Sequence, residues 1–229
     1  QPFPVTKLRL TDGQEILVLS KANFEGYYEN GGATTDSLKD GWLHTGDVAR
    51  FDEKGQLLII GRKQETMNTH GGRNFSPEFV EARLKFSPYI KEAVVLGQGQ
   101  TYLAALINID FENVGGWAEE RNIPCHSYKE LSLQSEIEQL IREEIAQINT
   151  ALPEKMKVLR MILLYKMLDE DDHVLTRTGK VKRDMVLEVY KEMVEAIYAD
   201  RSELPVKGKI RYRDGTVCDM ETRVRILDV

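Results

Sequence analysis

One short segment of the sequence has residue types that could hold the sugar of a nucleotide. It runs from Trp42 to Asp47 and ends in Thr-Gly-Asp. The carboxylate of Asp47 could accept hydrogen bonds from two neighbouring ribose hydroxyls, and such charge-assisted bonds are strong. Gly46 has no Cβ and would let a ligand come close to the backbone. The same residues could equally be a simple turn after a strand, so the segment alone leaves both interpretations open.

Two further segments contain cations and glycines that suit a nucleotide or a thin ligand. Arg62, within Gly-Arg-Lys-Gln, could face the same nucleotide, and a boundary between elements is where hinges occur. Gly71 and Gly72 lie between polar residues, where their missing Cβ atoms would let a ligand chain lie against the backbone. The competing interpretations are a charged crossing between domains and an ordinary loop.

A basic run from Thr176 to Arg183 precedes a helix and contains Lys180 directly after Gly179. A lysine on a glycine-flanked loop can deliver a point charge to a phosphoryl group. The run is not a P-loop, because Val181 stands where Ser or Thr is required and no glycine lies five residues before Gly179. A solvated charged surface is the alternative interpretation.

Composition argues against several other classes of function. The chain has 31 Lys and Arg against 37 Asp and Glu, a net charge of −6, which is unfavourable for a general nucleic-acid binder. The four histidines lack metal-ligand spacing with Cys125 and Cys218, so no metal site is predicted. So few cysteines favour a reducing compartment. No apolar run reaches the roughly 18 residues of a membrane helix.

The elements that must position these residues change in kind near Arg62. Before it, antiparallel hairpins are predicted around Asp12-Gly13 and around residues 52–55, with a short helix from Thr34 or Thr35 to Leu38. After it, helices and strands alternate. The helices are expected at 76–85, 111–121, 133–151 and 182–198, and the strands at 91–96, 102–109 and 160–168. A last hairpin is expected around Asp214-Gly215.

Taken together and in order, these segments resemble the adenylate-forming superfamily, which contains acyl-CoA synthetases, luciferases and peptide-synthetase adenylation domains. The resemblance extends from about Pro2 to Ala199. It rests on residues 40–47, 61–64, 71–77 with Glu81, and 176–180 with Arg183. The stretch after the hinge is more specific and resembles the long-chain fatty acyl-CoA ligase branch. Its matching parts are 88–90, 93–97, 102–107, 111–114, Trp117-Ala118 and the long helix up to Leu152.

The resemblance implies a mixed α/β (α+β) fold in successive parts. Residues 1–61 would be the β-rich C-terminal part of the large adenylation domain. Residues 62–199 would be the mobile C-terminal domain, with a small central sheet flanked by helices, and residues 200–229 a β-hairpin tail of unknown role. The family's phosphate loop and its Tyr-Gly-x-Thr-Glu segment do not occur in this sequence. We therefore expect the chain to be about the C-terminal third of an enzyme.

The resemblance also implies roles for the residues of the first segments. Asp47 resembles the residue that binds the ribose hydroxyls of ATP and AMP, and Arg62 resembles the arginine that supports it. Gln64 falls at the pivot of the hinge, where the family more often has Asp or Lys. Because a hinge must move, we expect few long-range contacts around Lys63.

The later segments match the parts of the family that act on CoA and on the phosphates. Gly71 and Gly72 resemble the loop that borders the pantetheine channel of CoA. Lys180 resembles the catalytic lysine of the adenylation step, and we expect its loop to be exposed. The proline that often precedes that lysine is absent here, and Val174 stands near its place.

The implied activity of the whole protein is that of an ATP-dependent long-chain fatty acid–CoA ligase. A fatty acid and ATP would give acyl-AMP and pyrophosphate, and CoA would then give acyl-CoA and AMP. Mg²⁺ is expected in the complete enzyme, with no ligands in this chain, and the partner is the N-terminal domain of the same protein. A cytoplasmic location follows, with peripheral membrane contact left open. The alternatives are an acyl-AMP ligase that loads a carrier protein, and a non-catalytic module that binds CoA or a partner.

Overall fold

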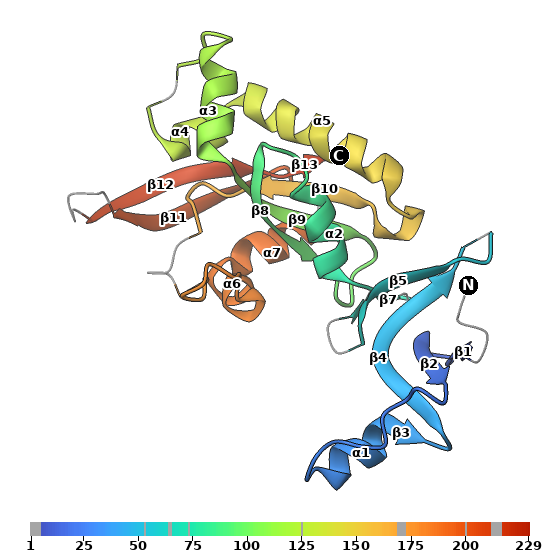
Figure 1. Ribbon diagram of the computed structural model, residues 1–229. Coiled ribbons are helices and arrows are strands. Elements are labelled where there is room, and N and C mark those ends of the chain that lie inside the picture. Colours follow the sequence, from blue (N-terminus) through green and yellow to red (C-terminus); the bar gives the residue numbers. More distant parts are fainter. Residues whose placement is uncertain are drawn as a thin grey trace. The chain divides into compact units, whose positions relative to one another are not determined.

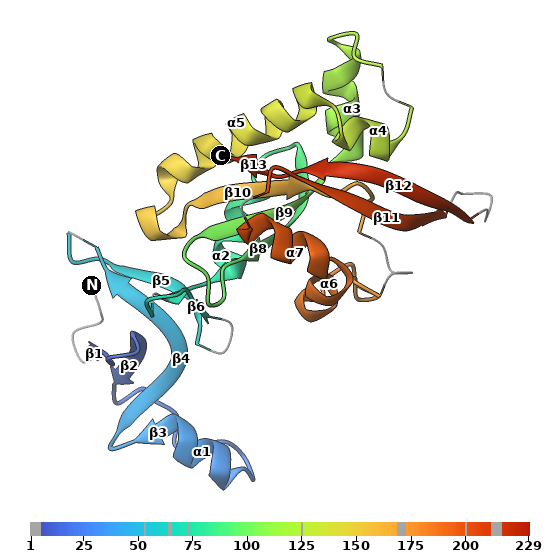
Figure 2. The same ribbon diagram turned by 180° about the vertical axis from the view of Figure 1, so that it is seen from behind.

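The computed structural model describes residues 6–52, 54–63, 66–72, 74–124, 126–168, 173–199, 201–211 and 217–229. Its elements are drawn in Figures 1 and 2. The chain divides into two compact units, which we call the first unit and the second unit. The first unit comprises residues 1–67 and 74–79, and the second comprises residues 68–73 and 80–229. The first is mostly strands and the second mixes helices with a central sheet, so the predicted mixed α/β class is confirmed.

The first unit is built on an antiparallel sheet with strand order β1-β2-β4-β3, in which β5 also pairs with β4. Its elements are β1 (Lys7–Leu10), β2 (Glu15–Leu19), α1 (Gly31–Ser37), β3 (Leu38–Lys39), β4 (Trp42–Phe51) and β5 (Leu57–Arg62). Both predicted hairpins are present, with Leu8 opposite Val18 and Phe51 opposite Leu57. Helix α1 begins earlier than expected, because the side chain of Asn30 caps it by accepting a hydrogen bond from the N–H of Ala33.

The chain passes from the first unit to the second through short elements. These are β6 (Met67–Asn68), β7 (Asn74–Phe75) and α2 (Pro77–Leu84). The Ser-Pro pair starts α2 as predicted, because the hydroxyl of Ser76 accepts a hydrogen bond from the N–H of Phe79 at 3.3 Å. The start of α2 is thus set by local capping chemistry.

The second unit contains a four-stranded sheet with order β13-β10-β9-β8. Its strands are β8 (Ile90–Leu96), β9 (Leu103–Ile109), β10 (Val158–Leu163) and β13 (Leu227–Asp228). Strands β9 and β10 are parallel, so a long crossover must join them. The crossover contains α3 (Phe111–Glu119), α4 (Tyr128–Ser132), α5 (Ser135–Ala151) and the 3₁₀ turn Glu154–Met156.

This sheet is covered on both faces, and for that reason every residue of β9 is buried. Ala104, Leu106 and Ile162 belong to one apolar cluster with buried residues of α6 (Arg183–Val189), of α7 (Lys191–Tyr198) and of the C-terminal strands. Side chains alternate between the faces of a sheet, so Ala105 and Met161 face the other side. Helix α5 contacts β10 and β13, and in both views β10 runs between α5 and α7 (Figures 1 and 2).

The last long helix predicted from the sequence is two helices in the structure. Helix α6 (Arg183–Val189) and helix α7 (Lys191–Tyr198) meet at Tyr190, whose backbone leaves helical geometry at φ −104° and ψ 25°. Tyr190 is buried, and the break changes which residues face the core. Val186 is fully buried, whereas Val189 is 45% exposed. The strand predicted at 160–168 also differs, because β10 ends at Leu163.

The C-terminal segment forms a hairpin and also contributes a strand to the main sheet. Its strands β11 (Glu203–Arg211) and β12 (Val217–Arg225) pair antiparallel, while the expected turn at Asp214-Gly215 lies outside the described residues. Strand β13 then pairs with β10, with Leu227 opposite Met161. Leu204, Val206, Val224 and Ile226 are buried in the apolar cluster. The segment therefore completes the core of the second unit.

Arg160, on β10, joins this segment to the end of α7. Its Nε lies 2.9 Å from Oδ1 of Asp228. Its terminal nitrogens donate to the carbonyl oxygens of Ile197, Ala199 and Arg201 at 2.9, 3.0 and 3.1 Å. The last carbonyls of a helix have no partner within the helix, so a cation at this end satisfies them and matches the helix dipole.

Candidate functional site

Asp47 and Arg62 face each other across neighbouring strands of the first unit. They are directly opposite in the β4–β5 pairing, and Nε of Arg62 lies 3.2 Å from Oδ1 of Asp47. A terminal nitrogen of Arg62 also donates to the carbonyl oxygen of Thr45 at 3.2 Å. The Asp47 side chain remains about a third exposed, at 32%. Its carboxylate is therefore oriented by Arg62 and still open to the hydroxyls of a ligand.

Gly46 lies in an irregular part of strand β4. Its φ is +70°, a conformation that favours glycine over other residues. The registers of β4 with β2 and with β5 both shift near this point. The carbonyl oxygen of Gly46 accepts a hydrogen bond from the backbone N–H of Lys63 at 2.6 Å. Gly46, which precedes Asp47, and Lys63, which follows Arg62, are thus in direct contact through their backbones.

Glu15 is a residue of this site that the sequence analysis missed. It is 5% exposed, and its carboxylate contacts Lys63 Nζ at 3.1 Å, His44 Nδ1 at 3.4 Å and the N–H of Gly46 at 3.2 Å. Burial opposes its ionisation, but the hydrogen bonds from Lys63, His44 and Gly46 outweigh burial and hold the pKa of Glu15 below its ordinary value. The only sequence signal was a charged residue at the start of an apolar strand.

These contacts correct the expectation for the hinge. Few long-range contacts were predicted around Lys63, but its backbone is bonded to Gly46 and its side chain to Glu15. These two contacts, with Gly46 and with Glu15, hold Lys63 to the sheet of the first unit. A hinge in this segment would therefore begin after Lys63. Gln64, the predicted pivot, lies outside the described residues.

Gly71 and Gly72 form a tight turn in the second unit. The N–H of Gly72 bonds the carbonyl oxygen of Thr69 at 3.0 Å, and the N–H of His70 bonds that of Gln100 at 2.7 Å. Both glycines have positive φ, +98° and +72°, and a Cβ added to either would meet no atom within 4 Å. The backbone conformation alone accounts for the two glycines. The space beside them is open to a ligand.

Lys180 lies at the end of a short hairpin-like loop in the second unit. Leu175 and Val181 form a bridge at its base, and the N–H of Thr176 bonds the carbonyl oxygen of Lys180 at 2.8 Å. The Thr176 hydroxyl accepts a hydrogen bond from the N–H of Lys180 at 3.0 Å. Gly179 has φ +75°, which lets the loop turn. Residues 177–180 are exposed, as expected for this loop.

An ion pair attaches the helix after this loop to the central sheet. Arg183, the first residue of α6, donates to the carbonyl oxygen of Val95 at 2.7 Å and pairs with Glu81. Glu81 also accepts a hydrogen bond from the N–H of Val95 at 2.8 Å. The two side chains therefore attach the start of α6 and the middle of α2 to β8. This contact gives the Lys180 loop a rigid base.

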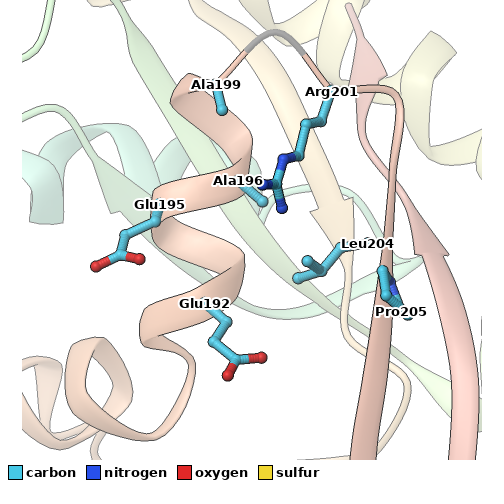
Figure 3. Close-up of a pocket in the computed structure, with 7 residues that line it drawn as sticks. All are labelled: Glu192, Glu195, Ala196, Ala199, Arg201, Leu204 and Pro205. Carbon is cyan, nitrogen blue, oxygen red and sulfur yellow. The ribbon is translucent and has the colours of Figure 1, made fainter.

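The predicted site residues are thus divided between the units. Asp47 and Arg62 form a contact in the first unit, whereas Gly71, Gly72 and Lys180 lie in the second. A hollow of about 310 Å³ lies between α7 and β11. Figure 3 shows its lining residues, among which Arg201 points inward. The hollow is lined by Glu192, Glu195, Ala196, Ala199, Arg201, Leu204 and Pro205. None of the predicted site residues lines it.

The described part of the chain has neither a cluster of metal-binding residues nor a membrane-spanning helix. Its His, Cys, Asp and Glu residues form no group of three or more that could hold a metal ion. Among the same residues, no helix has the length and apolar character of a membrane span.

Comparison with known proteins identifies the family. Residues 64–202 match the family model described as the AMP-binding enzyme C-terminal domain, which is more than half of the chain. The chain belongs to this family. The predicted adenylate-forming superfamily is therefore confirmed, and the match includes the helices and strands that surround the Lys180 loop.

The relatives of this AMP-binding domain agree with the predicted branch. The chain is 37% identical over 199 residues to the long-chain-fatty-acid–CoA ligase FadD15 of Mycobacterium tuberculosis, covering 86% of this chain and 33% of that protein. It is 27% identical to long-chain-fatty-acid–CoA ligase 1 of Cavia porcellus, covering 86% and 30%. The chain thus spans about a third of the length of these relatives.

Solved structures confirm the fold. The adenylation domain of the carboxylate reductase GR01_22995 from Mycobacterium chelonae superposes with a TM-score of 0.57 at 22% identity, covering 85% of this chain and 31% of that one. The adenylation domain of the carboxylic acid reductase from Segniliparus rugosus, in complex with AMP and a co-purified carboxylic acid, gives 0.55 at 18% identity, covering 84% and 31%.

Proposed function

We propose that the chain is the C-terminal portion of an ATP-dependent long-chain fatty acid–CoA ligase. The observation that carries the proposal is the 37% identity to a long-chain-fatty-acid–CoA ligase across 86% of the chain. In the first step the fatty acid carboxylate attacks the α-phosphorus of ATP and releases pyrophosphate. In the second step the CoA thiol attacks the acyl-AMP carbonyl and releases AMP. The relatives support CoA as acceptor over a carrier protein, and a ligase over a binding module.

The parts of the chain would serve different parts of this enzyme. Residues 1–61 would belong to the large adenylation domain, residues 62–199 would form the mobile domain, and residues 200–229 the tail. The change of unit near Met67 supports a boundary in this region. The N-terminal domain of the same protein would complete the site. The complete enzyme would be cytoplasmic, and peripheral contact with a membrane is compatible with this location.

The first unit would bind the nucleotide during the adenylation step. Asp47 would accept hydrogen bonds from the ribose hydroxyls, and Arg62 would orient its carboxylate, as their 3.2 Å contact supports. Lys180 would place its charge on the α-phosphate, where negative charge gathers as the bond to pyrophosphate breaks. Mg²⁺ would enter with ATP and neutralise its phosphates, held by groups outside the described residues.

The second step would require a different face of the mobile domain. Rotation about Gln64 would move Lys180 away and bring Gly71 and Gly72 toward the pantetheine of CoA. The open space beside the two glycines supports passage of a narrow chain. The fixed position of Lys63 supports a pivot that lies immediately after it.

The proposal is tested by assaying the complete protein. We expect fatty-acid-dependent exchange of pyrophosphate into ATP, followed by CoA-dependent release of AMP and formation of the thioester. A complete protein that forms acyl-AMP but transfers it only to a carrier protein would contradict CoA as the acceptor. Absence of fatty-acid-dependent exchange would contradict the ligase assignment.

The 229-residue chain by itself is expected not to form acyl-AMP. Its sequence has no Gly-rich Ser/Thr loop before Asp47 to hold the phosphates, and it spans about a third of its relatives. The measurement is pyrophosphate release with ATP and a fatty acid, with the complete protein as positive control. Release by the isolated chain above background would show that these residues suffice for catalysis.

The hydroxyl of Thr176 is expected to contribute to adenylation in the complete enzyme. Thr176→Val removes the acceptor for the N–H of Lys180 while keeping the side-chain shape. We expect acyl-AMP formation to slow about tenfold, because a misplaced loop misdirects the lysine. Thr176→Ser should restore the rate. Thr150→Val is the control, because Thr150 is an exposed threonine of α5 whose hydroxyl donates to the carbonyl oxygen of Gln147, away from this loop. Equal rates for the two valine variants would contradict the prediction.

A further inference from the structure

Glu15 contacts one sequence neighbour of each of Asp47 and Arg62, the two residues proposed to bind the ribose. It begins β2 and is 5% exposed. Its Oε1 accepts a hydrogen bond at 3.2 Å from the N–H of Gly46, the residue before Asp47. Its Oε2 lies 3.1 Å from Nζ of Lys63, the residue after Arg62. One buried carboxylate thus contacts both Gly46, the neighbour of Asp47, and Lys63, the neighbour of Arg62.

The backbone closes these contacts into a ring. The carbonyl oxygen of Gly46 accepts a hydrogen bond from the N–H of Lys63 at 2.6 Å, so Glu15, Gly46 and Lys63 each contact the other two. Gly46 lies where the strand registers shift, and its N–H is taken by the carboxylate. Because a backbone N–H that loses its partner away from water is costly, this segment depends on the Glu15 side chain.

The ring differs from an ordinary surface ion pair. The Lys63 side chain is 58% exposed, and an exposed lysine paired with an exposed carboxylate would contribute little. The Glu15 side chain is only 6% exposed, and it also contacts His44. A buried charge with several partners holds them in a narrow range of positions, because losing any of them leaves it poorly solvated.

We propose that Glu15 is a positioning residue for nucleotide binding: through Gly46 and Lys63 it holds Asp47 and Arg62 opposite each other and fixes the stationary end of the hinge. The inference rests on the proposed function. Glu15 does not itself touch the nucleotide. When it is altered, Gly46 and Lys63 keep only their backbone hydrogen bond, and Asp47 can shift relative to Arg62. Displacements of about 1 Å are enough to weaken a binding site severely.

The test compares kinetic constants of variants of the complete enzyme. Glu15→Gln keeps an acceptor for Gly46 but removes the charge opposite Lys63. We expect the KM for ATP to rise about tenfold, with kcat changed less than about threefold and the KM for CoA unchanged. Lys63→Met should act in the same direction. The double variant should add little to either single variant, since both break the same contact.

Glu92→Gln is the matched control, because it breaks a Lys–Glu pair of similar length, 3.0 Å from Lys85, in the second unit. It should leave the KM for ATP unchanged. The inference is overturned if Glu15→Gln lowers the melting temperature but not the affinity for ATP, or if Glu92→Gln has the same effect. If Glu15→Gln does not fold, Lys63→Met decides, and an unchanged KM overturns the inference. A wild-type enzyme that forms no acyl-AMP contradicts the proposed function itself, and with it this inference.

Discussion

Replacing Lys180 with alanine in the complete enzyme is expected to slow acyl-AMP formation by about 100-fold or more. A single positioned charge on the α-phosphate typically accounts for about 10²–10³ in rate, because the site is dry and the charge needs no reorganisation. The loop that carries Lys180 is shaped by Thr176 and Gly179 and is exposed. The exposure of this loop is compatible with the proposed role of Lys180.

The second half-reaction provides the discriminating measurement for Lys180. Thioester formation from supplied acyl-AMP should be almost unaffected in Lys180→Ala, because the proposed rotation has by then moved the loop away. Lys182→Ala is the control, since Lys182 is a nearby exposed cation that precedes α6. Single-turnover rates of both variants in both half-reactions should be compared. If the two variants behave alike, Lys180 is one solvated charge among several and the assignment is wrong.

Replacing Arg160 with methionine is expected to destabilise the second unit by about 1–3 kcal/mol. The substitution removes a charged donor from the carbonyl oxygens of Ile197 and Ala199 and frees Asp228 from its ion pair. The two carbonyl oxygens keep one hydrogen bond each, from the hydroxyl of Tyr102 and from the N–H of Arg201, so the cost is that of lost charged hydrogen bonds and not of unsatisfied acceptors. The Arg160 side chain is 18% exposed, and methionine was chosen because its unbranched side chain can fill much of the space of the arginine stem.

The measurement is urea unfolding of the chain followed by tryptophan fluorescence. The chain has two tryptophans, Trp42 in the first unit and Trp117 in the second, so a Trp42→Phe background makes the signal specific to the second unit. Arg223→Met is the control, because it breaks an exposed ion pair with Glu203 and should cost less than about 1 kcal/mol. Equal losses in the two variants would show that Arg160 does not connect the C-terminal segment to α7.

The sequence by itself determined the family, the class of fold and most of the elements. Apolar residues with helical spacing predicted the long helix that the structure places at Ser135–Ala151, and Ser-Pro predicted the start of α2. Asp12-Gly13 predicted the first hairpin. These features depend on local rules of spacing, capping and turn chemistry, which act over a few residues and can be read without the rest of the molecule. The proposed roles of Asp47, Arg62 and Lys180 came instead from the resemblance of their motifs, taken in order, to the adenylate-forming superfamily.

Contacts between distant parts of the chain were decided only by the tertiary structure. Glu15 lies 48 residues before Lys63, and nothing local to either residue predicts their pairing. Arg160 and Asp228 are 68 residues apart, and their contact depends on β13 joining the sheet beside β10. The break at Tyr190 interrupts a stretch whose apolar spacing is that of one continuous helix. In each case the position is set by burial and pairing across the fold, which spacing along the sequence does not contain.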